Sequence, residues 1–281
     1  MARLNSRHQY QPQSYPRVSE MAVFTELSDE DRISIAAAYE MKTLTSVIGI
    51  ENGDTETTYL FRTTDGEFIV TLFENGAEPL DLERAFATMD TLFAKGVPCP
   101  KPRRTSEGKA TFNAAGRLVA VVTFLPGFPS RNPDLAKFSN LGGVMAQIHS
   151  AFERISDVAS MDLPTGSVHG SLLNDNVFFL NDDVSGVINF RLRHDDILIS
   201  EVADVLVGWT SSDSGELESD KAGAILRGYE AIRNLSQSEK AALPVFVFAS
   251  AAKYYASRMA NDRTIELATA AYESFNSQYV G

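Results

Sequence analysis

The sequence predicts an α+β protein of two lobes, in which a small strand-rich lobe precedes a larger helical lobe. β-Branched and aromatic residues dominate between residues 43 and 73, whereas helical spacing of apolar residues dominates after Pro126. Pro126-Gly127 breaks the chain between these regions and predicts a hinge near 124–127. We therefore expect a disordered tail at 1–20, a first lobe at 21–126 and a helical second lobe at 127–281.

The first lobe is expected to begin with a helix and to continue with strands. Ser28 and Asp31 have the spacing of a helix N-terminal cap. β-Branched and aromatic residues predict strands at 43–50, 57–63 and 67–73. The sequence "TTDGEF" predicts a hairpin turn between the second and third strands.

A helix and a strand complete the first lobe. Apolar residues recur at three- and four-residue steps over 79–95, and Lys95-Gly96 ends this helix. "GRLVAVVTFL" predicts a further buried strand. In the second lobe one helical face carries five apolar residues, Leu135, Phe138, Leu141, Met145 and Ile148. The turn "NDD" at 181–183 joins two short strands, and helical patterns continue to the end of the chain.

The composition limits the classes of partner. The chain has 25 Lys and Arg against 37 Asp and Glu, a formal charge of −12, which repels phosphate backbones and argues against a nucleic-acid partner. The single cysteine, Cys99, cannot form an internal disulfide or a cysteine zinc cluster, which favours a cytoplasmic protein. No apolar run reaches the roughly 18 residues that a membrane span needs. Arg3, Arg7 and Arg17 leave organelle targeting as a minor alternative to a plain disordered tail.

The stretch "SVHGSLLNDNVFFLNDDVSGVINF", residues 167–190, carries the functional prediction. Two short strands joined by an acidic turn, each preceded by polar residues, are typical of a nucleotide-kinase site. In such a site a carboxylate orients the attacking hydroxyl, and an asparagine and a second carboxylate hold magnesium on the phosphates.

This stretch resembles the pattern H-[GA]-D-x-x-x-D-N-V-x-F followed by S-G-[VL]-I-D-F. That pattern belongs to the homoserine kinase branch of the aminoglycoside phosphotransferase and choline kinase superfamily. "MAVFTELSDED", "GEFIVTLFE", "GVPCPKP" and "LVAVVTFLPG" are similar to the same branch in the same order, so the resemblance covers most of residues 21–210. It implies a protein kinase-like fold, with ATP and Mg²⁺ as the expected ligands.

The resemblance also assigns roles within the motif. His169 matches the histidine that supports the catalytic loop, and Asn176 matches the metal-binding asparagine. Ser171 and Asn189 stand where the family has its catalytic and metal-binding aspartates, and Glu201 stands at a downstream aspartate position. A serine hydroxyl does not accept a proton at neutral pH as a carboxylate does, and an amide offers magnesium no charge. The resemblance therefore implies weak or absent use of ATP and Mg²⁺.

Two further groups of residues are candidates for the site. Asp195 and Asp196 closely follow the second short strand, as replacement metal ligands or as a solvated acidic start to the next helix. In "GDTETTY", Gly53, Thr55 and Thr57 are candidates to bind nucleotide phosphates.

Two further features of the sequence concern the pockets. Thr71 stands where many related kinases place a strand lysine, although the homoserine kinase branch shares this Thr-Leu pattern. The connection between "AQIHS" and "SVHGS" is shorter than in the family, which implies a reduced acceptor pocket. Four residues are expected to be structural or solvent-facing rather than functional: His149, Cys99, Trp209 and His194.

Three hypotheses follow. The leading one is a homoserine kinase-like pseudokinase, catalytically impaired, that serves as a binding or scaffold subunit with a protein partner or a larger assembly. The alternative is an active ATP-dependent phosphotransferase for homoserine or a related small hydroxyl acceptor, with metal held by Asn176 and Asp195 or Asp196. The third is a sensor that binds a nucleotide or metabolite and reports through lobe closure.

Overall fold

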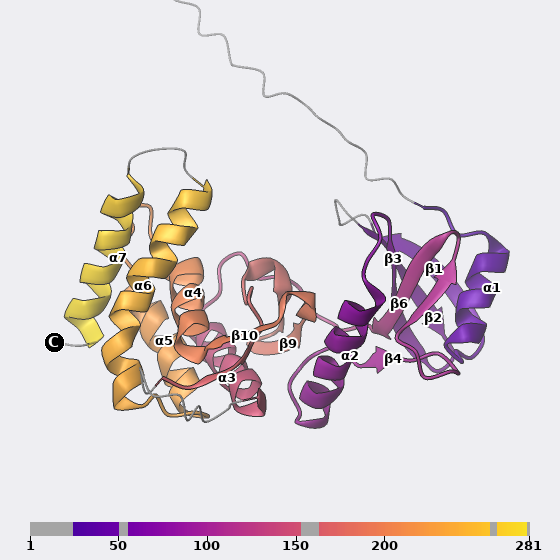
Figure 1. Ribbon diagram of the computed structural model, residues 1–281, viewed down its shortest axis with the longest axis horizontal. Coiled ribbons are helices and arrows are strands. Elements are labelled where there is room, and N and C mark those ends of the chain that lie inside the picture. Colours follow the sequence, from indigo (N-terminus) through magenta and orange to yellow (C-terminus); the bar gives the residue numbers. More distant parts are fainter. Residues whose placement is uncertain (1–24, 51–55, 153–162, 259–262, 280–281) are drawn as a thin grey trace, which may run out of the picture.

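The computed structural model describes residues 25–50, 56–152, 163–258 and 263–279. Figure 1 shows a strand-rich N-terminal lobe, elements α1 to β6, beside a helical C-terminal lobe, elements α3 to α7. The α+β, two-lobed architecture predicted from the sequence is therefore confirmed. The predicted tail at 1–20 and the loop residues Gly53 and Thr55 lie outside the described residues.

The N-terminal lobe contains one antiparallel sheet with the order β1-β2-β3-β6-β4, and β5 also pairs with β6. Its strands are β1 (Leu44–Ile50), β2 (Glu56–Thr63), β3 (Gly66–Phe73), β4 (Pro102–Arg103), β5 (Thr111–Ala114) and β6 (Arg117–Thr123). The first three strands start within one residue of the predicted positions, because their β-branched and aromatic residues extend over the full length of each strand. The two short strands β4 and β5 were not predicted.

Helix α1 (Asp29–Ala38) begins where the sequence predicts it. Ser28 Oγ accepts a hydrogen bond from the Asp31 backbone amide at 3.1 Å, and Asp31 Oδ2 accepts one from the Ser28 amide at 3.0 Å. This reciprocal pair satisfies two amides that the first helical turn would otherwise leave without partners. The helix buries Ile35 against the sheet.

The two faces of the sheet have different neighbours. Alternate residues of β3, including Val70 and Leu72, pack under α1 in a core of their own. The other alternate residues, Ile69 and Thr71, face a cleft that is closed on one side by α2 (Pro79–Ala94). The strand period of two therefore separates a structural face of the sheet from a face available for a ligand.

The linker between the lobes is anchored on a hairpin of the C-terminal lobe. This hairpin consists of β8 (Val177–Leu180) and β9 (Asp183–Val187), joined at the predicted acidic turn. Phe128 exchanges two backbone hydrogen bonds with Phe179, at 3.1 and 3.0 Å. Gly127 has a φ of 126°, and a Cβ there would lie 2.8 Å from the Phe179 carbonyl oxygen. Only glycine fits this close approach of the linker to the hairpin.

The C-terminal lobe is built on five helices in the described residues. They are α3 (Leu135–Phe152), α4 (Leu198–Thr210), α5 (Ser219–Glu230), α6 (Gln237–Arg258) and α7 (Thr264–Tyr279). A short antiparallel pair, β7 (Thr165–Val168) and β10 (His194–Ile197), lies at the start of α4. As expected, Trp209 packs against the core: its partly buried ring lies edge-on to Phe138 and Phe179, and Nε1 donates to the Leu172 carbonyl at 2.7 Å.

Cys99 is buried where α2 meets the linker to β4. Its Sγ lies 3.6 Å from the Met89 carbonyl oxygen. Burial, with the negative charge of Asp90 nearby, raises the pKa of the thiol to about 12. The expected packed, unreactive cysteine is confirmed. Among the described helices, none is long and apolar enough to cross a membrane.

Candidate active site

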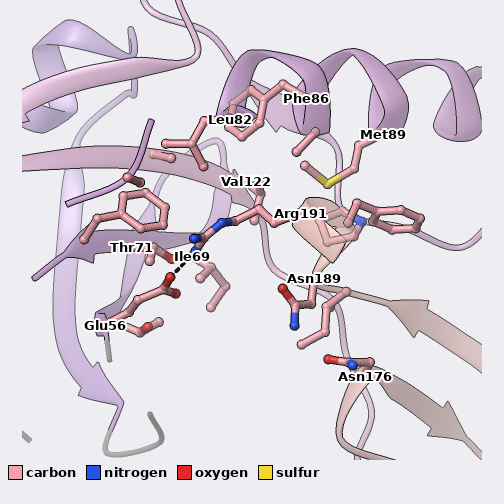
Figure 2. Close-up of a pocket in the computed structure, with 18 of the residues that line it drawn as sticks. Glu56, Ile69, Thr71, Leu82, Phe86, Met89, Val122, Asn176, Asn189 and Arg191 are labelled. Atoms are coloured by element: carbon pink, nitrogen blue, oxygen red, sulfur yellow. Dashed lines mark hydrogen bonds and ion pairs between the residues drawn. The ribbon is translucent and has the colours of Figure 1, made fainter. Parts of the chain in front are cut away.

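A cleft of about 800 Å³ lies between the lobes, within the size range of small-molecule sites. Its upper walls are apolar, formed by Ile69 and Val122 of the sheet and by Leu82, Phe86 and Met89 of α2. Its other wall comes from the C-terminal lobe and carries polar groups, as Figure 2 shows. An apolar slot with a polar end suits a ligand with a flat ring and a charged tail.

The polar wall begins with the loop that follows β7. His169 is buried, with Nε2 donating to the Ile188 carbonyl at 2.7 Å and Nδ1 accepting from the Ser171 amide at 3.2 Å. Burial lowers the pKa of His169, and these two partners require the neutral ring. His169 therefore holds the loop in shape, as the resemblance implied, and does not face the cleft.

Ser171 and Asn176 are held together. Asn176 Nδ2 donates to the Ser171 carbonyl at 2.9 Å and lies 3.2 Å from Ser171 Oγ. A carbonyl oxygen accepts but does not donate, so the amide nitrogen must face the loop and Oδ1 must face the other way. Asn176 lines the cleft, and in Figure 2 its oxygen points into it.

Asn189 lies across the cleft wall from Asn176. It has a left-handed backbone, with φ of 70°, a conformation that asparagine adopts more readily than most residues. It precedes a short 3₁₀ turn, η2 (Phe190–Leu192), and lines the cleft. Two amide side chains therefore line this wall: Asn176 at the family's asparagine position, and Asn189 where the family pattern has a metal-binding aspartate.

Arg191, in the 3₁₀ turn, extends across the cleft to the N-terminal lobe. Its guanidinium forms an ion pair with Glu56 at the start of β2. The same group lies 5.1 Å from the centre of the Phe73 ring, and Phe73 pairs with Glu56 in the sheet. No local sequence pattern indicates Arg191, because its partner is 135 positions away in the chain.

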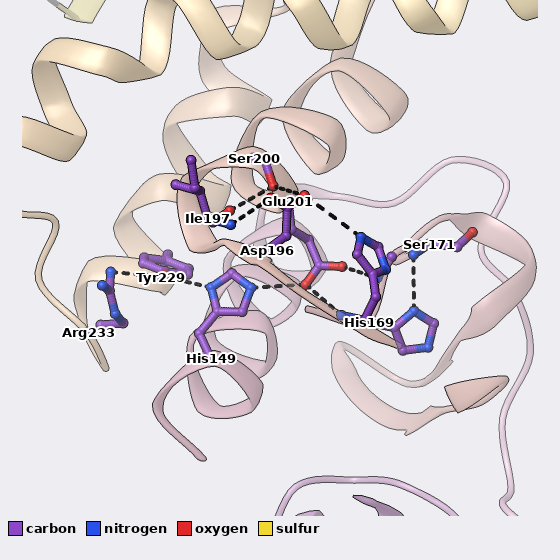
Figure 3. Close-up of polar contacts among 11 residues, drawn as sticks. His149, His169, Ser171, Asp196, Ile197, Ser200, Glu201, Tyr229 and Arg233 are labelled. Carbon is purple, nitrogen blue, oxygen red and sulfur yellow. Dashed lines mark hydrogen bonds and ion pairs between the residues drawn. The ribbon is translucent and has the colours of Figure 1, made fainter. Parts of the chain in front are cut away.

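Glu201 of α4 is the buried hub behind the loop (Figure 3). Its Oε2 accepts from the His169 amide at 3.1 Å and Oε1 from the Gly170 amide at 2.6 Å. His149 Nε2 also lies 2.9 Å from Oε2, and His149 Nδ1 lies 2.8 Å from the Tyr229 hydroxyl. Burial alone would raise the pKa of Glu201, but the hydrogen bond from His149, the charge interaction with His149 and the hydrogen bond from the Gly170 amide hold it below its usual value. The expected structural role of His149 is confirmed.

Asp195 and Asp196, the candidate replacement ligands, are engaged elsewhere and do not line the cleft. They lie on β10, paired with β7. Asp195 Oδ1 accepts from Ser167 Oγ at 3.0 Å and from Arg193 at 3.1 Å. Asp196 accepts from the Ile197 amide at 2.7 Å and from Ser200 at 3.2 Å, in the first turn of α4. Both aspartates therefore lie on strand β10, before α4 begins at Leu198, and Ile197 rather than either of them is the N-cap residue of that helix.

Thr57, a candidate phosphate ligand, is buried on the sheet face opposite the cleft. Its Oγ1 donates to Glu74 at 2.5 Å and accepts from the Thr25 amide at 3.1 Å. The neighbours Glu56 and Thr58 line the cleft, because side chains alternate along β2. The period of the strand is the signal that could have identified Thr58. Thr71 also lines the cleft, and His194, as expected, is exposed.

A second cavity of about 230 Å³ lies on the other side of the loop, lined by Gly170 and Ser171. Its remaining walls come from α4 and α6 and include Asp204, Ser250 and Lys253. Ser250 Oγ donates to Asp204 Oδ1 at 2.5 Å. None of these three residues was singled out from the sequence, because α4 and α6 come together only in the fold.

The donor set shows which ligands this site suits. Among the described residues no three His, Cys, Asp or Glu side chains are grouped to hold a metal ion. Hard divalent cations prefer carboxylate oxygens, and Asn176 and Asn189 offer only neutral ones. The cleft therefore fits a nucleotide better than it fits a magnesium ion.

Comparison with known proteins agrees with this geometry. Residues 46–164 match the model of the phosphotransferase enzyme family. The homoserine kinase of Granulibacter bethesdensis is 33% identical over 85% of this chain and 88% of its own length. The homoserine kinase of Acidiphilium cryptum is 32% identical over the same shares.

Solved structures share the fold. A microcompartment-associated aminopropanol kinase superposes with a TM-score of 0.60 at 16% identity, covering 87% of this chain and 98% of that one. An aminoglycoside phosphotransferase from Alicyclobacillus acidocaldarius gives 0.58 at 11% identity, covering 85% and 88%. With kinase-type motifs in order, a loop held by Glu201 and relatives matched along most of their length, the chain belongs to the homoserine kinase branch of the phosphotransferase enzyme family.

Proposed function

We propose that the chain is an ATP-dependent phosphotransferase that phosphorylates the hydroxyl group of a small amino acid of the homoserine type. The observation that carries this proposal is the position of the loop at 169–176 between two cavities. Asn176 lines the large cleft, whereas Ser171 lines the small cavity behind it. Transfer between two small molecules needs donor and acceptor on either side of one such loop.

The large cleft suits the donor. The adenine ring would lie between Ile69, Val122 and Met89, and the phosphates would extend toward Asn176 and Asn189. Relatives named homoserine kinase over most of this chain support ATP as that donor. Because the amides form a poor magnesium site, no step of the proposal depends on a metal.

The small cavity suits the acceptor. The Asp204 carboxylate would bind an ammonium group, and Lys253 would bind a carboxylate, as an amino acid requires. A volume of about 230 Å³ admits only a small molecule. The acceptor hydroxyl would then face Ser171, next to the incoming phosphoryl group.

The chemistry is a single displacement. A bond forms between the acceptor oxygen and the γ-phosphorus, the bond from that phosphorus to the bridging oxygen breaks, and ADP leaves. The hydroxyl proton passes to the transferred phosphoryl group or to water. Ser171 Oγ orients the acceptor hydroxyl by accepting its hydrogen bond and does not take the proton. Since phosphoryl transfer has a loose transition state, positioning alone retains part of the rate, although losing a general base costs about 10²–10⁴-fold.

The test is turnover by the purified chain with ATP and homoserine. ADP release is measured by a coupled assay and phosphohomoserine by phosphorus NMR. We expect slow acceptor-dependent turnover that rises about 10²-fold in Ser171→Asp, because a carboxylate restores the general base. Ser130→Asp, in the interlobe linker and in neither cavity, serves as the matched control and leaves the rate unchanged. Absence of product from both the wild type and Ser171→Asp contradicts the proposal.

A second candidate is favoured by the two neutral residues Ser171 and Asn189. In this case the chain binds a nucleotide without transferring phosphate and serves as a binding or scaffold subunit, or as a sensor. Thermal unfolding with and without nucleotide tests binding, because a ligand of the folded state raises the melting temperature, and the turnover assay then distinguishes the candidates. A nucleotide-dependent shift without any turnover supports the second candidate. Either function belongs in the cytosol, where ATP and free amino acids meet.

A further inference from the structure

We propose that Arg191 binds the nucleotide phosphates directly and supplies the positive charge that a metal ion supplies in other kinases, so that nucleotide binds without divalent cations. The inference rests on the cleft being a nucleotide site, but it does not require phosphate transfer. It follows from two observations: the cleft suits a nucleotide, but Asn176 and Asn189 provide a poor site for the metal ion that usually accompanies one.

The charge distribution in the cleft points to Arg191. Three carboxylates are among its described lining residues, Glu56, Glu78 and Asp81. Arg191 is the one cationic side chain among those described residues, and the sheet presents Thr71 rather than a lysine. The three carboxylates would repel a polyphosphate in this cleft, and among the described lining residues Arg191 is the side chain whose charge would attract it. Guanidinium binds phosphate oxygens through two parallel hydrogen bonds, which makes it the appropriate group.

The guanidinium is also in the right place. It is attached two residues after Asn189 and lies above that residue in the centre of Figure 2. The Phe73 ring supports it at 5.1 Å, so its position does not depend on the ion pair alone. Phe73 itself is buried, and its ring is a fixed platform.

Glu56 then acts as an internal substitute for the phosphate. Its carboxylate pairs with Arg191 and holds the guanidinium across the cleft. The side chains are 41% and 31% exposed, and a pair this open to water is weak. A phosphate group carries more charge than a carboxylate and would displace Glu56. The ion pair is thus an autoinhibitory contact that nucleotide binding releases.

The experiment is calorimetric titration of the full chain with ADP and with ATP, in excess EDTA and in Mg²⁺. We expect affinities that agree within about threefold in the two conditions. Arg191→Gln weakens binding in EDTA about tenfold or more, since a charge-assisted hydrogen bond is lost. Glu56→Gln strengthens it, because the competing carboxylate is removed. Asn189→Asp makes binding depend on Mg²⁺, since it restores a charged ligand.

Arg62→Gln is the matched control. Arg62 lies at the other end of β2, pairs with Glu67 with similar exposure, and does not line the cleft. It should leave affinity unchanged. Thermal melting without ligand shows whether Arg191→Gln is folded. Glu56→Gln provides a second check, because it should strengthen nucleotide binding where Arg191→Gln weakens it.

Each outcome is decisive. Binding of the wild type only with Mg²⁺, or binding in EDTA that Arg191→Gln leaves intact, overturns the inference while the proposed transferase survives. Arg191-dependent binding in EDTA without any turnover supports the inference and contradicts the transferase. Absence of nucleotide binding in every condition overturns both.

Discussion

The amide nitrogen of Asn176 donates to the carbonyl oxygen of Ser171 at 2.9 Å, and this contact fixes which end of the amide faces the cleft. Asn176→Asp removes the donor and places a negative oxygen against a carbonyl oxygen. We expect it to lower the free energy of unfolding by about 1 kcal/mol, near the lower end of the cost of an unsatisfied polar group, because the site is only partly buried. Urea unfolding measures the change.

Asn181→Asp is the control for Asn176→Asp. Asn181 is exposed in the turn between β8 and β9, and its backbone is also left-handed, with φ of 55°. Aspartate tolerates that conformation, so the stability should change by about 0.5 kcal/mol or less. Equal effects of the two substitutions would show that the Ser171 contact contributes nothing.

Glu201 holds the loop through two backbone amides, so replacing it should lower the free energy of unfolding. Glu201→Gln leaves a neutral group in a site built for a carboxylate, and we expect a loss of about 3 kcal/mol or more. Glu230→Gln, which breaks an exposed pair with Lys240, should change stability by at most about 1 kcal/mol. A loss of unfolding free energy of about 1 kcal/mol or less in Glu201→Gln would contradict the role of Glu201 in holding the loop.

The same carboxylate predicts a dependence on pH. Its pKa is lower in the folded chain than the ordinary 4.5, so its contribution is present above about that pH and is lost as the pH falls through the folded value. Comparing unfolding curves of the wild type and Glu201→Gln between pH 7 and pH 3 should show the difference shrinking toward acid. A constant difference would contradict this linkage.

Thr57 is expected to affect stability and not nucleotide binding. Burial alone would raise the pKa of Glu74, but hydrogen bonds from Thr25, Thr57 and Arg117 lower it to about 2. Thr57→Val removes one of these bonds, so the pKa should rise and stability at pH 7 should fall by about 1 kcal/mol. Nucleotide affinity should be unchanged, because Thr57 does not line the cleft. Tenfold weaker nucleotide binding by Thr57→Val would contradict this prediction and would indicate that Thr57 contacts the nucleotide phosphates.

The sequence is informative where one segment determines its own structure. The strands of the first lobe, the cap at Ser28 and the loop at 169–176 all follow from local patterns. The strand at His194–Ile197 was missed because its residues show no apolar alternation, although its pairing with β7 directs Asp195 and Asp196 away from the cleft. The contact of Arg191 with Glu56 depends on the closed fold, and no local pattern encodes it.

The packing of α3 on α5 permits a sharp test of close approach. A Cβ on Gly228 would lie 1.8 Å from the Ser139 carbonyl oxygen, whereas a Cβ on Gly143 would meet no atom nearer than 3.6 Å. Gly228→Ala should therefore lower the free energy of unfolding by about 3 kcal/mol or more, because the two helices must move apart. Gly143→Ala should be neutral or stabilising by up to about 1 kcal/mol, since alanine favours a helix. Thermal melting of the two variants measures the difference, and equal melting temperatures would contradict the close approach of the helices at Gly228.

The burial of Cys99 has a practical consequence. With one cysteine in the chain, and that one enclosed beside Met89 with a thiol pKa raised to about 12, the folded protein offers thiol reagents nothing to react with. Every labelling event must then pass through an opening of the region between α2 and the linker to β4. The labelling rate therefore reports how often that region opens, and a nucleotide that closes the lobes on each other would lower the rate in the unmutated protein.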